Sequence, residues 1–581
     1  MKIRPLTREI PDHLMKYITE QDPTLYTSID QACWRYILKL SREFFETHAH
    51  QKYLDGLRDT GISLERIPLI EEMDTCLRKF NWRAVSVAGF IPSAAFMEFL
   101  SLGILPIACD MRKLENIAYT PAPDIVHEAA GHAPIIADPE YADYLRSYGE
   151  ISKKAITSLE DLNVYEAIRH LSETKEDPHA TQESVDAAQR GLNEALSAVT
   201  YTSEATQLSR MGWWTFEYGL FGPLSEPKIY GAGLLSSLSE SFHCFDPAVK
   251  KIRFSITCTE VAFDITRPQP QLFVAPNFPA LRDTLMTLGD QMAFRKGGLE
   301  GLRKALQCKT TTTTTLDSGI QISGVLSQIH QNAAGEPVYL NFKGPTQLSY
   351  EDQEIPEQGT RHHREGFGTP LATVTTMDLQ KWNIREDEMS EFALETGVKI
   401  RGRLVRKIEI NQTLLILTFE NCTVSYEGKT LFQPEWGLYD MACGKKVTSV
   451  FGGPADRDAF GLPPSLSHTL ARAQKTNQTQ ANQALGELYA QVRRIREKPL
   501  SPVQDLKQIE TVYQKLVSAY PQDWLLRYEI LEWLSDRAIQ VDWKTQLILE
   551  LEAIAQSSRE TGEIIHRGIE ILNRNVSKSS H

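Results

Sequence analysis

The sequence lacks the features that mark membrane and secreted proteins. No window of its 581 residues approaches the roughly 18 uninterrupted apolar residues of a membrane-spanning helix. The N-terminal segment contains no apolar core of signal-peptide length. The eight cysteines are scattered without CxxC pairs, which argues against a disulfide framework or a zinc ribbon. We therefore expect a cytoplasmic protein with reduced thiols and no membrane partner.

An excess of basic charge is also missing. The formal net charge is -13 and is spread along the chain, which argues against a broad nucleic-acid-binding surface.

The length suffices for about two to four domains with sizeable cores. Only a short arm precedes the first helical pattern at Ser28, so we expect no regulatory domain ahead of the core.

The segment from Pro121 to Pro134 carries the clearest chemical signal. It combines two histidines and a glutamate with apolar residues that would bury them, namely Ile125, Val126, Ala129 and Ala130. Polar side chains in such surroundings need a partner, because burying them without one is costly. A metal ion is the leading explanation, and a pair of hydrogen-bonded structural histidines is the alternative.

The spacing of His127 and His132 restricts the kind of metal site. Five residues correspond to about 140° on a straight α-helix, so one such helix cannot present both to one ion. The zinc-protease pattern spaces its histidines by four and differs from this one. Gly131 predicts a helix end, and Pro134 discourages further helix, so we expect His132 to fold back from a loop. Two histidines leave room for a carboxylate and for open positions, as in non-haem iron oxygenases.

A candidate third ligand is Glu217, which lies among aromatic residues in the segment 212–220. An unpaired carboxylate would be costly there, although a salt bridge is an equally common explanation. The segment Tyr230–Ser237 resembles a phosphate-binding glycine loop only loosely, and a tight turn into a helix explains it better.

The rest of the chain divides by pattern. We predict a mainly α-helical catalytic domain with short strands over residues 1–305, with a helical insert at about 151–203. Residues 306–319, which contain a threonine run, are interpreted as a linker. A β-rich domain is expected over 320–460 and an α-helical region over 461–581.

Two weaker patterns lie in the β-rich part. Residues 324–351 resemble residues 402–427, with shared glycine, asparagine, phenylalanine and threonine positions, which suggests two related β units. The stretch His362–Glu365 could bind a metal, but a solvated loop explains it better. We found no catalytic constellation after residue 300, so oligomerisation or regulation is the default hypothesis for that half.

Taken together, these motifs resemble the pterin-dependent aromatic amino acid hydroxylases, and the phenylalanine 4-hydroxylase type most of all. The family's metal motif stands intact from Pro123 to Pro134, its carboxylate motif from Trp213 to Leu220, and its Tyr-Gly-Ala-Gly-Leu-Leu-Ser-Ser signature at Tyr230–Ser237. Further matches are residues 87–112, 119–121 and 269–275. The resemblance covers about residues 25–295, and the stretch 151–203 is longer than in the family. This longer stretch could be a lid, an interface or a spacer.

The resemblance implies a complete set of site residues. The Fe(II) ligands would be His127, His132 and Glu217. Arg112 would pair with the substrate carboxylate, a task that suits the guanidinium fork. The amino acid pocket would also contain Thr120, Pro123, Trp213, Gly233 and Ser236. The tetrahydropterin, tetrahydrobiopterin or a relative, would contact Gly89, Phe90, Ile91, Phe96 and Glu128.

The activity that the resemblance implies is the hydroxylation of L-phenylalanine to L-tyrosine with Fe(II), O2 and a tetrahydropterin. Hydroxylation of tryptophan or tyrosine by the same mechanism is the first alternative. A zinc hydrolase that uses Glu128 as its base, and a binding protein with an inactive oxygenase core, are alternatives from other classes. A homo-oligomer formed through the C-terminal half is also expected.

Overall fold

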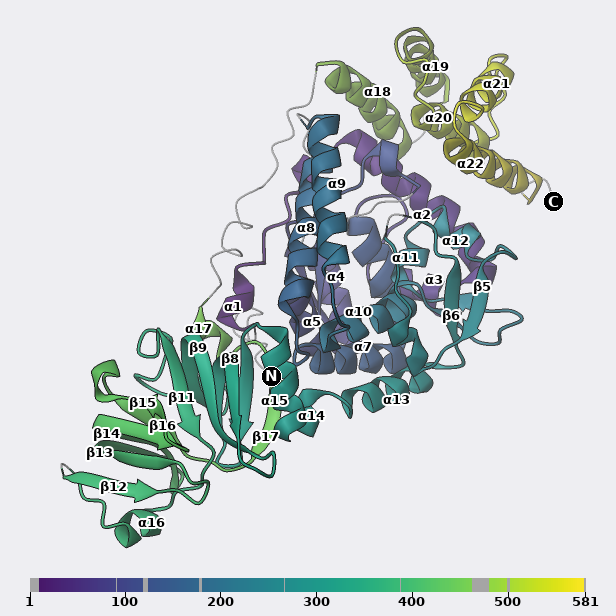
Figure 1. Ribbon diagram of the computed structural model, residues 1–581. Helices are drawn as coiled ribbons and strands as arrows, with labels where there is room; N and C mark the ends of the chain where they lie inside the picture. The colour runs from purple at the N-terminus through teal and green to yellow at the C-terminus, as the bar shows by residue number, and fades with distance from the viewer. Residues whose placement is uncertain are drawn as a thin grey trace. The chain divides into compact units, whose positions relative to one another are not determined.

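A computed structural model describes residues 10–89, 91–118, 124–176, 180–265, 267–386, 388–461, 480–498 and 502–578 (Figure 1). The chain forms two compact bodies. The helical body comprises Lys16–Gly149, Arg210–Arg282 and Leu470–His581, and the β body comprises Met1–Met15, Glu150–Ser209 and Asp283–Thr469. The β body therefore contains both the predicted insert and the predicted β-rich domain. The described part of the chain has no helix long and apolar enough to cross a membrane.

The helical body is built from many helices and two small sheets. The strands β1 (Arg83–Val87) and β2 (Ile104–Ala108) pair in parallel, and a second sheet has the order β4-β3-β6-β5. The strands of that second sheet are β3 (Leu220–Phe221), β4 (Lys228–Ile229), β5 (Lys250–Arg253) and β6 (Gln271–Ala275). The first part of the chain supplies the helices α2 (Ser28–His48), α3 (Tyr53–Asp59), α4 (Ile70–Leu77), α5 (Ser93–Ser101), α6 (Ala133–Ile136) and α7 (Pro139–Ser152). The later helices of this body are α11 (Ala232–Leu235) and α12 (Glu240–His243), and the division between the two bodies falls within α10 (Glu204–Gly212) and α13 (Phe278–Gly289).

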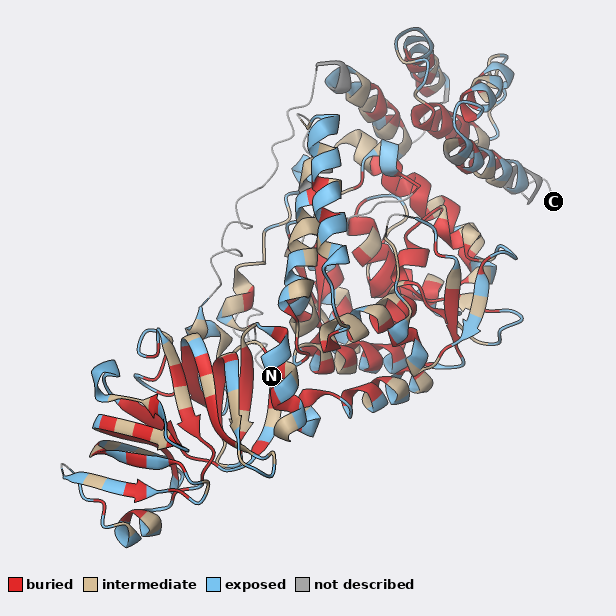
Figure 2. Ribbon diagram, viewed as in Figure 1, coloured by how far each residue is buried: buried red, intermediate tan, exposed pale blue. Residues whose placement is uncertain are grey.

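The beginning of α2 illustrates how the sequence sets these elements. Thr27 accepts the backbone N–H of Asp30, and the Asp30 carboxylate accepts the backbone N–H of Thr27. This reciprocal capping box satisfies two backbone groups that the first turn would otherwise leave unpaired. The helix then buries most of its length, which appears red in Figure 2.

The C-terminal helices pack on α2 and do not form a separate region. These helices are α18 (Gln480–Glu497), α19 (Pro502–Ala519), α20 (Leu525–Asp536), α21 (Lys544–Ala555) and α22 (Arg559–Lys578). The fully buried guanidinium of Arg35 on α2 pairs with Glu529 and Glu532 on α20. Tyr36 donates its hydroxyl to the carbonyl of Ile564 at 2.7 Å. The contact between α2 and the C-terminal helices therefore joins buried charges and rings, not only surface groups.

The predicted insert forms a helical hairpin in the β body. Helix α8 (Leu159–Glu176) and helix α9 (Gln182–Ser197) pack against each other along a small apolar cluster that includes Leu171, Ala188 and Leu192. Most of α9 is exposed and pale blue in Figure 2, whereas most of the described residues of α8 are of intermediate burial.

The predicted linker at 306–319 is wrong. Helix α15 (Gly298–Cys308) continues to residue 308, and Thr312–Leu316 form β7, which lies between β8 and β17 in a six-stranded sheet. The side chains of Thr312, Thr313 and Thr314 are fully buried. Threonine is β-branched and favours strands, so a run of threonines inside a fold is better explained by a strand than by a linker.

The β body contains two related hairpins, which agrees with the internal repeat in the sequence (Figure 1). The first is β8 (Ile320–Gln331) with β9 (Pro337–Tyr350), and the second is β13 (Lys399–Ile410) with β14 (Thr413–Tyr426). Each hairpin has a bulge at its shared glycine, Gly324 in β8 and Gly402 in β13, and two more bulges at matching positions further along. The other elements are β10 (Gln353–Glu354), β11 (Gly366–Pro370), α16 (Thr376–Lys381), β12 (Met389–Ala393), β15 (Lys429–Phe432), β16 (Tyr439–Ala442), β17 (Val447–Gly452), α14 (Ala293–Lys296) and α17 (Arg457–Phe460).

Candidate metal centre

The two histidines lie on one π-helix, η5 (Val126–His132), which continues into α6. The prediction that the helix ends at Gly131 and that His132 folds back from a loop is wrong. A π-helix closes hydrogen bonds five residues apart, as from the N–H of Ala133 to the carbonyl of Glu128, so residues spaced by five come to the same side. The imidazole centroids of His127 and His132 are 5.0 Å apart.

Gly131 has a packing role and does not terminate the helix. It is absent from the residues with positive φ in the described structure, and a Cβ placed on it would lie 2.7 Å from the carbonyl oxygen of Ala232. Helix α11 therefore approaches η5 so closely that only glycine fits at this contact. Pro134 lies in the first turn of α6 and has no N–H to donate, and the carbonyl of Ala130, four residues earlier, accepts the hydroxyl of Tyr53 at 2.8 Å.

Glu217 lies on a second π-helix, η6 (Trp213–Glu217), and reaches both histidines. Its Oε2 is 3.2 Å from Nε2 of His127, and its Oε1 is 3.3 Å from Nε2 of His132. The carboxylate thus bridges the two imidazoles by one oxygen each. The structure therefore brings together all three residues that the resemblance named as ligands.

Nearby hydroxyl groups hold η6 in place. Thr215 donates its hydroxyl to the carbonyl of Met211, and Tyr144 donates to Oγ1 of Thr215 at 2.9 Å. Both side chains are fully buried, so the π-helix that carries Glu217 is fixed from inside the body.

The charges in this cluster influence one another strongly. Burial alone would lower the pKa of His127, but the charge of Glu217 and its hydrogen bond raise it to about 9. Burial would raise the pKa of Glu217, but the facing imidazoles of His132 and His127 hold it well below its ordinary value. Without a bound cation, His127 and Glu217 therefore share a proton, and a cation bound between Nε2 and the carboxylate would displace this proton.

A hydrogen bond from Ser236 fixes the ring of His127. The hydroxyl of Ser236 donates to the carbonyl of Ala232 at 2.7 Å, and Oγ lies 3.1 Å from Nδ1 of His127. Since the single hydroxyl proton is already used, Oγ must accept a proton from Nδ1. Nε2, which faces Glu217, is then the nitrogen that shares a proton with this carboxylate or, once a cation displaces the proton, binds the cation.

His132 gives the strongest indication that this cluster binds a cation. Neither of its ring nitrogens has a hydrogen bond among the described residues, although the side chain is almost completely buried and Nε2 lies 3.3 Å from Glu217. A buried imidazole without a hydrogen bond is costly, and a metal ion held by Nε2 and the Glu217 carboxylate would satisfy it. Two imidazoles and a carboxylate are the donor set of mononuclear iron sites and of catalytic zinc sites.

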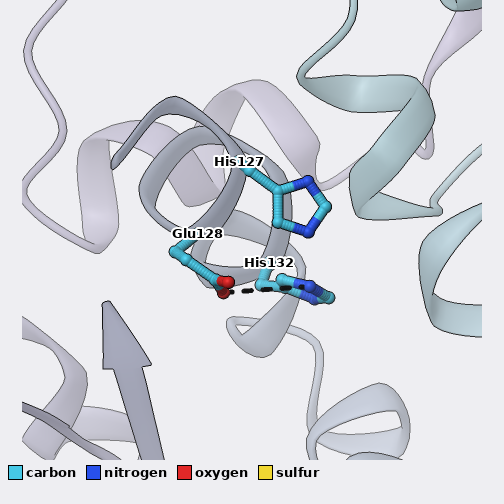
Figure 3. A group of neighbouring side chains, drawn as sticks. All are labelled: His127, Glu128 and His132. Carbon is cyan, nitrogen blue, oxygen red and sulfur yellow. Dashed lines mark ion pairs between the residues drawn. The ribbon is translucent and has the colours of Figure 1, made fainter. Parts of the chain in front are cut away.

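Glu128 lies beside this donor set but is less well placed to complete it (Figure 3). Its Oε2 is 3.9 Å from Nε2 of His132, further than either oxygen of Glu217 is from its imidazole. Burial raises the pKa of Glu128, and its Oε2 has no hydrogen-bond partner among the described residues. We therefore assign Glu217 to the donor set, and we regard Glu128 as a neighbour of the donors and not as a ligand.

Arg112 is buried and paired within the chain. Its Nε and Nη2 donate to the two carboxylate oxygens of Asp124 at 2.8 Å each, and its Nη1 donates to the carbonyl of Ser236 at 2.8 Å. Among the described residues these partners use three of the five guanidinium N–H groups. Asp124 also accepts the N–H of His127 and so caps the start of the helix.

The remaining expected residues are placed as follows. Phe90, Thr120 and Pro123 lie outside the described residues. Gly89 and Ile91 lie between β1 and α5, Gly89 has a φ of 62°, and Phe96 lies on α5. Trp213 stacks on Tyr218 and Phe263 with ring centroids 4.4 and 4.3 Å apart, and a Cβ on Gly233 would lie 2.6 Å from the Tyr218 ring.

Two of these contacts were not expected from the sequence. The sequence analysis gives Asp124 no role of its own, although an aspartate just before a helix is a typical N-terminal cap. Phe263 carries no local signal, because its stacking on Trp213 joins residues 50 positions apart.

The chain is similar to several known proteins. A family model described as biopterin-dependent aromatic amino acid hydroxylase matches residues 6–166 and 187–334, and the gap falls inside the helical hairpin. The chain is 30% identical over 266 residues to the phenylalanine-4-hydroxylase of Mesorhizobium japonicum, covering 45% of this chain and 80% of the relative. It is 27% identical over 292 residues to that of Ralstonia nicotianae, covering 48% and 78%. A structure of Chromobacterium violaceum phenylalanine hydroxylase with iron(III) and 7,8-dihydrobiopterin is 23% identical, with a TM-score of 0.38, covering 50% of this chain and 92% of that one.

Proposed function

The chain belongs to the biopterin-dependent aromatic amino acid hydroxylase family, and on that premise we propose that it hydroxylates L-phenylalanine to L-tyrosine. The co-substrates are O2 and a tetrahydropterin, and the metal is Fe(II). The observation that carries the proposal is the buried imidazole of His132, without a hydrogen bond among the described residues, beside a carboxylate that also reaches His127.

In this proposal His127, His132 and Glu217 would hold the iron, and three protein donors would leave coordination positions for other ligands. When bound, the iron and the reduced pterin together activate dioxygen for attack on the aromatic ring. The chain itself supplies position. Ser236 accepts the Nδ1 proton of His127 and so leaves Nε2 to the metal, and Glu217 is held by the buried π-helix residues Thr215 and Phe216.

Arg112 would bind the substrate carboxylate through the N–H groups that do not donate to Asp124 or to the Ser236 carbonyl. Asp124 holds the guanidinium rigid, so little conformational entropy is lost when the substrate binds. We assign the amino acid pocket to Thr120, Pro123, Trp213, Gly233 and Ser236.

The pterin would lie against Gly89, Phe90, Ile91 and Phe96, with Glu128 as its polar partner. The positive φ of Gly89 and the open space around it leave the backbone accessible to a flat ring. Because burial raises the pKa of Glu128, this carboxyl group can hold a proton to share with the ring.

Hydroxylation of tryptophan or tyrosine by the same mechanism remains the alternative. A zinc hydrolase is not favoured, because the family match extends over both ligand segments. The test is a product analysis of the iron-loaded protein with a tetrahydropterin and each of the three amino acids. Tyrosine from phenylalanine as the main product supports the proposal, and faster turnover of tryptophan or tyrosine contradicts it.

Three further expectations stay proposals. The scattered cysteines favour a cytoplasmic location. A homo-oligomer through the C-terminal half can be tested by sedimentation. The helical hairpin α8–α9 is a lid, an interface or a spacer. Deletion of the hairpin would change the substrate affinity if it is a lid, the mass of the oligomer if it is an interface, and neither if it is a spacer.

A further inference from the structure

A second cluster of metal-ligand side chains lies in the β body. His362 and His363 lie between β10 and β11, and Asp440 lies on β16. Nε2 of His362 is 2.7 Å from Oδ2 of Asp440, and Nε2 of His363 is 4.0 Å from the same oxygen. His362 thus contacts the carboxylate directly, whereas Nε2 of His363 lies near the same oxygen without bonding to it.

The carboxylate belongs to a row of side chains that crosses three strands. Asp440 of β16 pairs in register with Thr418 of β14, which pairs with Arg406 of β13. Thr418 donates its hydroxyl to Oδ1 of Asp440. This bond leaves Oδ2 to the two imidazoles.

The related hairpin shows that the fold does not require this carboxylate. The matching row there is Gly368 of β11, Asn341 of β9 and Gln328 of β8. The same strand pairing is thus formed with a glycine where the second hairpin has a buried aspartate. Because burying a carboxylate is costly, Asp440 needs an explanation other than strand pairing.

Neighbouring residues compensate that charge only in part. Nη2 of Arg406 is 3.9 Å from Oδ1 of Asp440, whereas its Nη1 makes a closer contact of 2.7 Å with Glu357. Oε1 of the fully buried Gln358 is 2.8 Å from Nε2 of His363, and its Nε2 has no hydrogen-bond partner among the described residues. Gln358 therefore holds the ring of His363, and Nε2 of this ring stays 4.0 Å from Oδ2 of Asp440, a separation that one cation between the two atoms can span.

We propose that Nε2 of His362, Nε2 of His363 and Oδ2 of Asp440 bind a divalent transition-metal cation, with the amide oxygen of Gln358 in reach as a fourth donor. Two imidazoles and one carboxylate suit Zn2+ or Fe2+ and leave coordination positions open. A cavity of about 840 Å³, which His362 lines together with Thr418 and Arg406, adjoins these donors through His362. The site is therefore accessible to a small molecule, and it is separate from the donor set of His127, His132 and Glu217.

The test is a count of bound Co2+ by metal analysis after equilibrium dialysis of the metal-free full-length protein. We expect His362→Ala to bind one equivalent less than the wild type. His362 is the mildest change because its side chain is 35% exposed. The matched control is His330→Ala, which removes a histidine that bonds Asn341 on the related hairpin and should not change the count.

The readout does not depend on the proposed hydroxylase site. In a Glu217→Ala background, the further change His362→Ala should still remove one equivalent. Asp440→Asn should do the same, with circular dichroism as the check on folding. Equal Co2+ counts for His362→Ala, His330→Ala and the wild type would overturn the proposal.

Discussion

The close contact at Gly131 predicts that replacing glycine by alanine has opposite effects on stability at Gly131 and at Gly191. Gly131→Ala adds a Cβ that lies 2.7 Å from the oxygen, 2.9 Å from the Cβ and 3.0 Å from the Cα of Ala232. Gly191→Ala adds the same atom on α9 with nothing within 4 Å. The first change should destabilise the protein, and the second should stabilise it.

The magnitudes follow from two terms. Replacing glycine by alanine in a helix gains about 0.5–1 kcal/mol, because alanine loses less backbone entropy on folding. Overpacking a rigid contact costs about 1–3 kcal/mol. Gly191→Ala should therefore gain the first amount, whereas Gly131→Ala should lose up to roughly 2 kcal/mol after both terms are combined.

Gly131→Ala should also impair the metal centre. To relieve the contact, η5 must move away from α11, and His132 is the next residue in the chain. Urea denaturation measures the free energy of unfolding, and iron content at limiting free Fe(II) measures the site. Adding Ala232→Gly removes only the 2.9 Å contact, so it should restore part of each loss.

The result that would refute this reasoning is a Gly131→Ala protein as stable and as rich in iron as the wild type. Such a result would mean that α11 and η5 separate freely. A destabilising Gly191→Ala would instead refute the energy assigned to the glycine replacement itself.

Three further predictions concern side chains of the centre. Glu217→Ala should abolish both iron binding and turnover, and an active, iron-loaded variant would remove Glu217 from the ligand set. Ser236→Ala should lower the metal affinity about 10- to 100-fold, because the ring of His127 loses its Nδ1 partner. The control is Ser241→Ala, which removes a buried serine that donates to a backbone carbonyl elsewhere. Equal metal affinities of the two variants would contradict this role of Ser236. Arg112→Lys should raise the KM for phenylalanine strongly, since lysine cannot form the paired contacts of the guanidinium, and an unchanged KM would exclude Arg112 from the substrate site.

Local patterns in the sequence predicted several elements well. The strand Ile104–Ala108 and the helix from Ser28 have the expected places, because their apolar spacing follows the usual periods. The two related hairpins were visible in the sequence because bulges at Gly324 and Gly402 require the same residue type at the same position.

Other features lay beyond such patterns. A period of 3.6 residues cannot reveal a π-helix, so the spacing of His127 and His132 suggested a broken helix when the helix is in fact continuous. Glu217 is 85 residues from His132, and only the family resemblance, not the spacing, brought them together. The strand β7 was predicted to be part of a linker, because the threonine run itself does not show that it pairs with β8 and β17.

The pairing of Arg35 with Glu532 joins positions 497 residues apart. At about 5–20 residues per second, a ribosome needs roughly 25–100 s to produce the second partner after the first. During that interval the buried face of α2 has no C-terminal helices to cover it. The nascent chain must therefore keep this surface from aggregating until translation is nearly complete, a demand that a protein ending after the oxygenase core would not face.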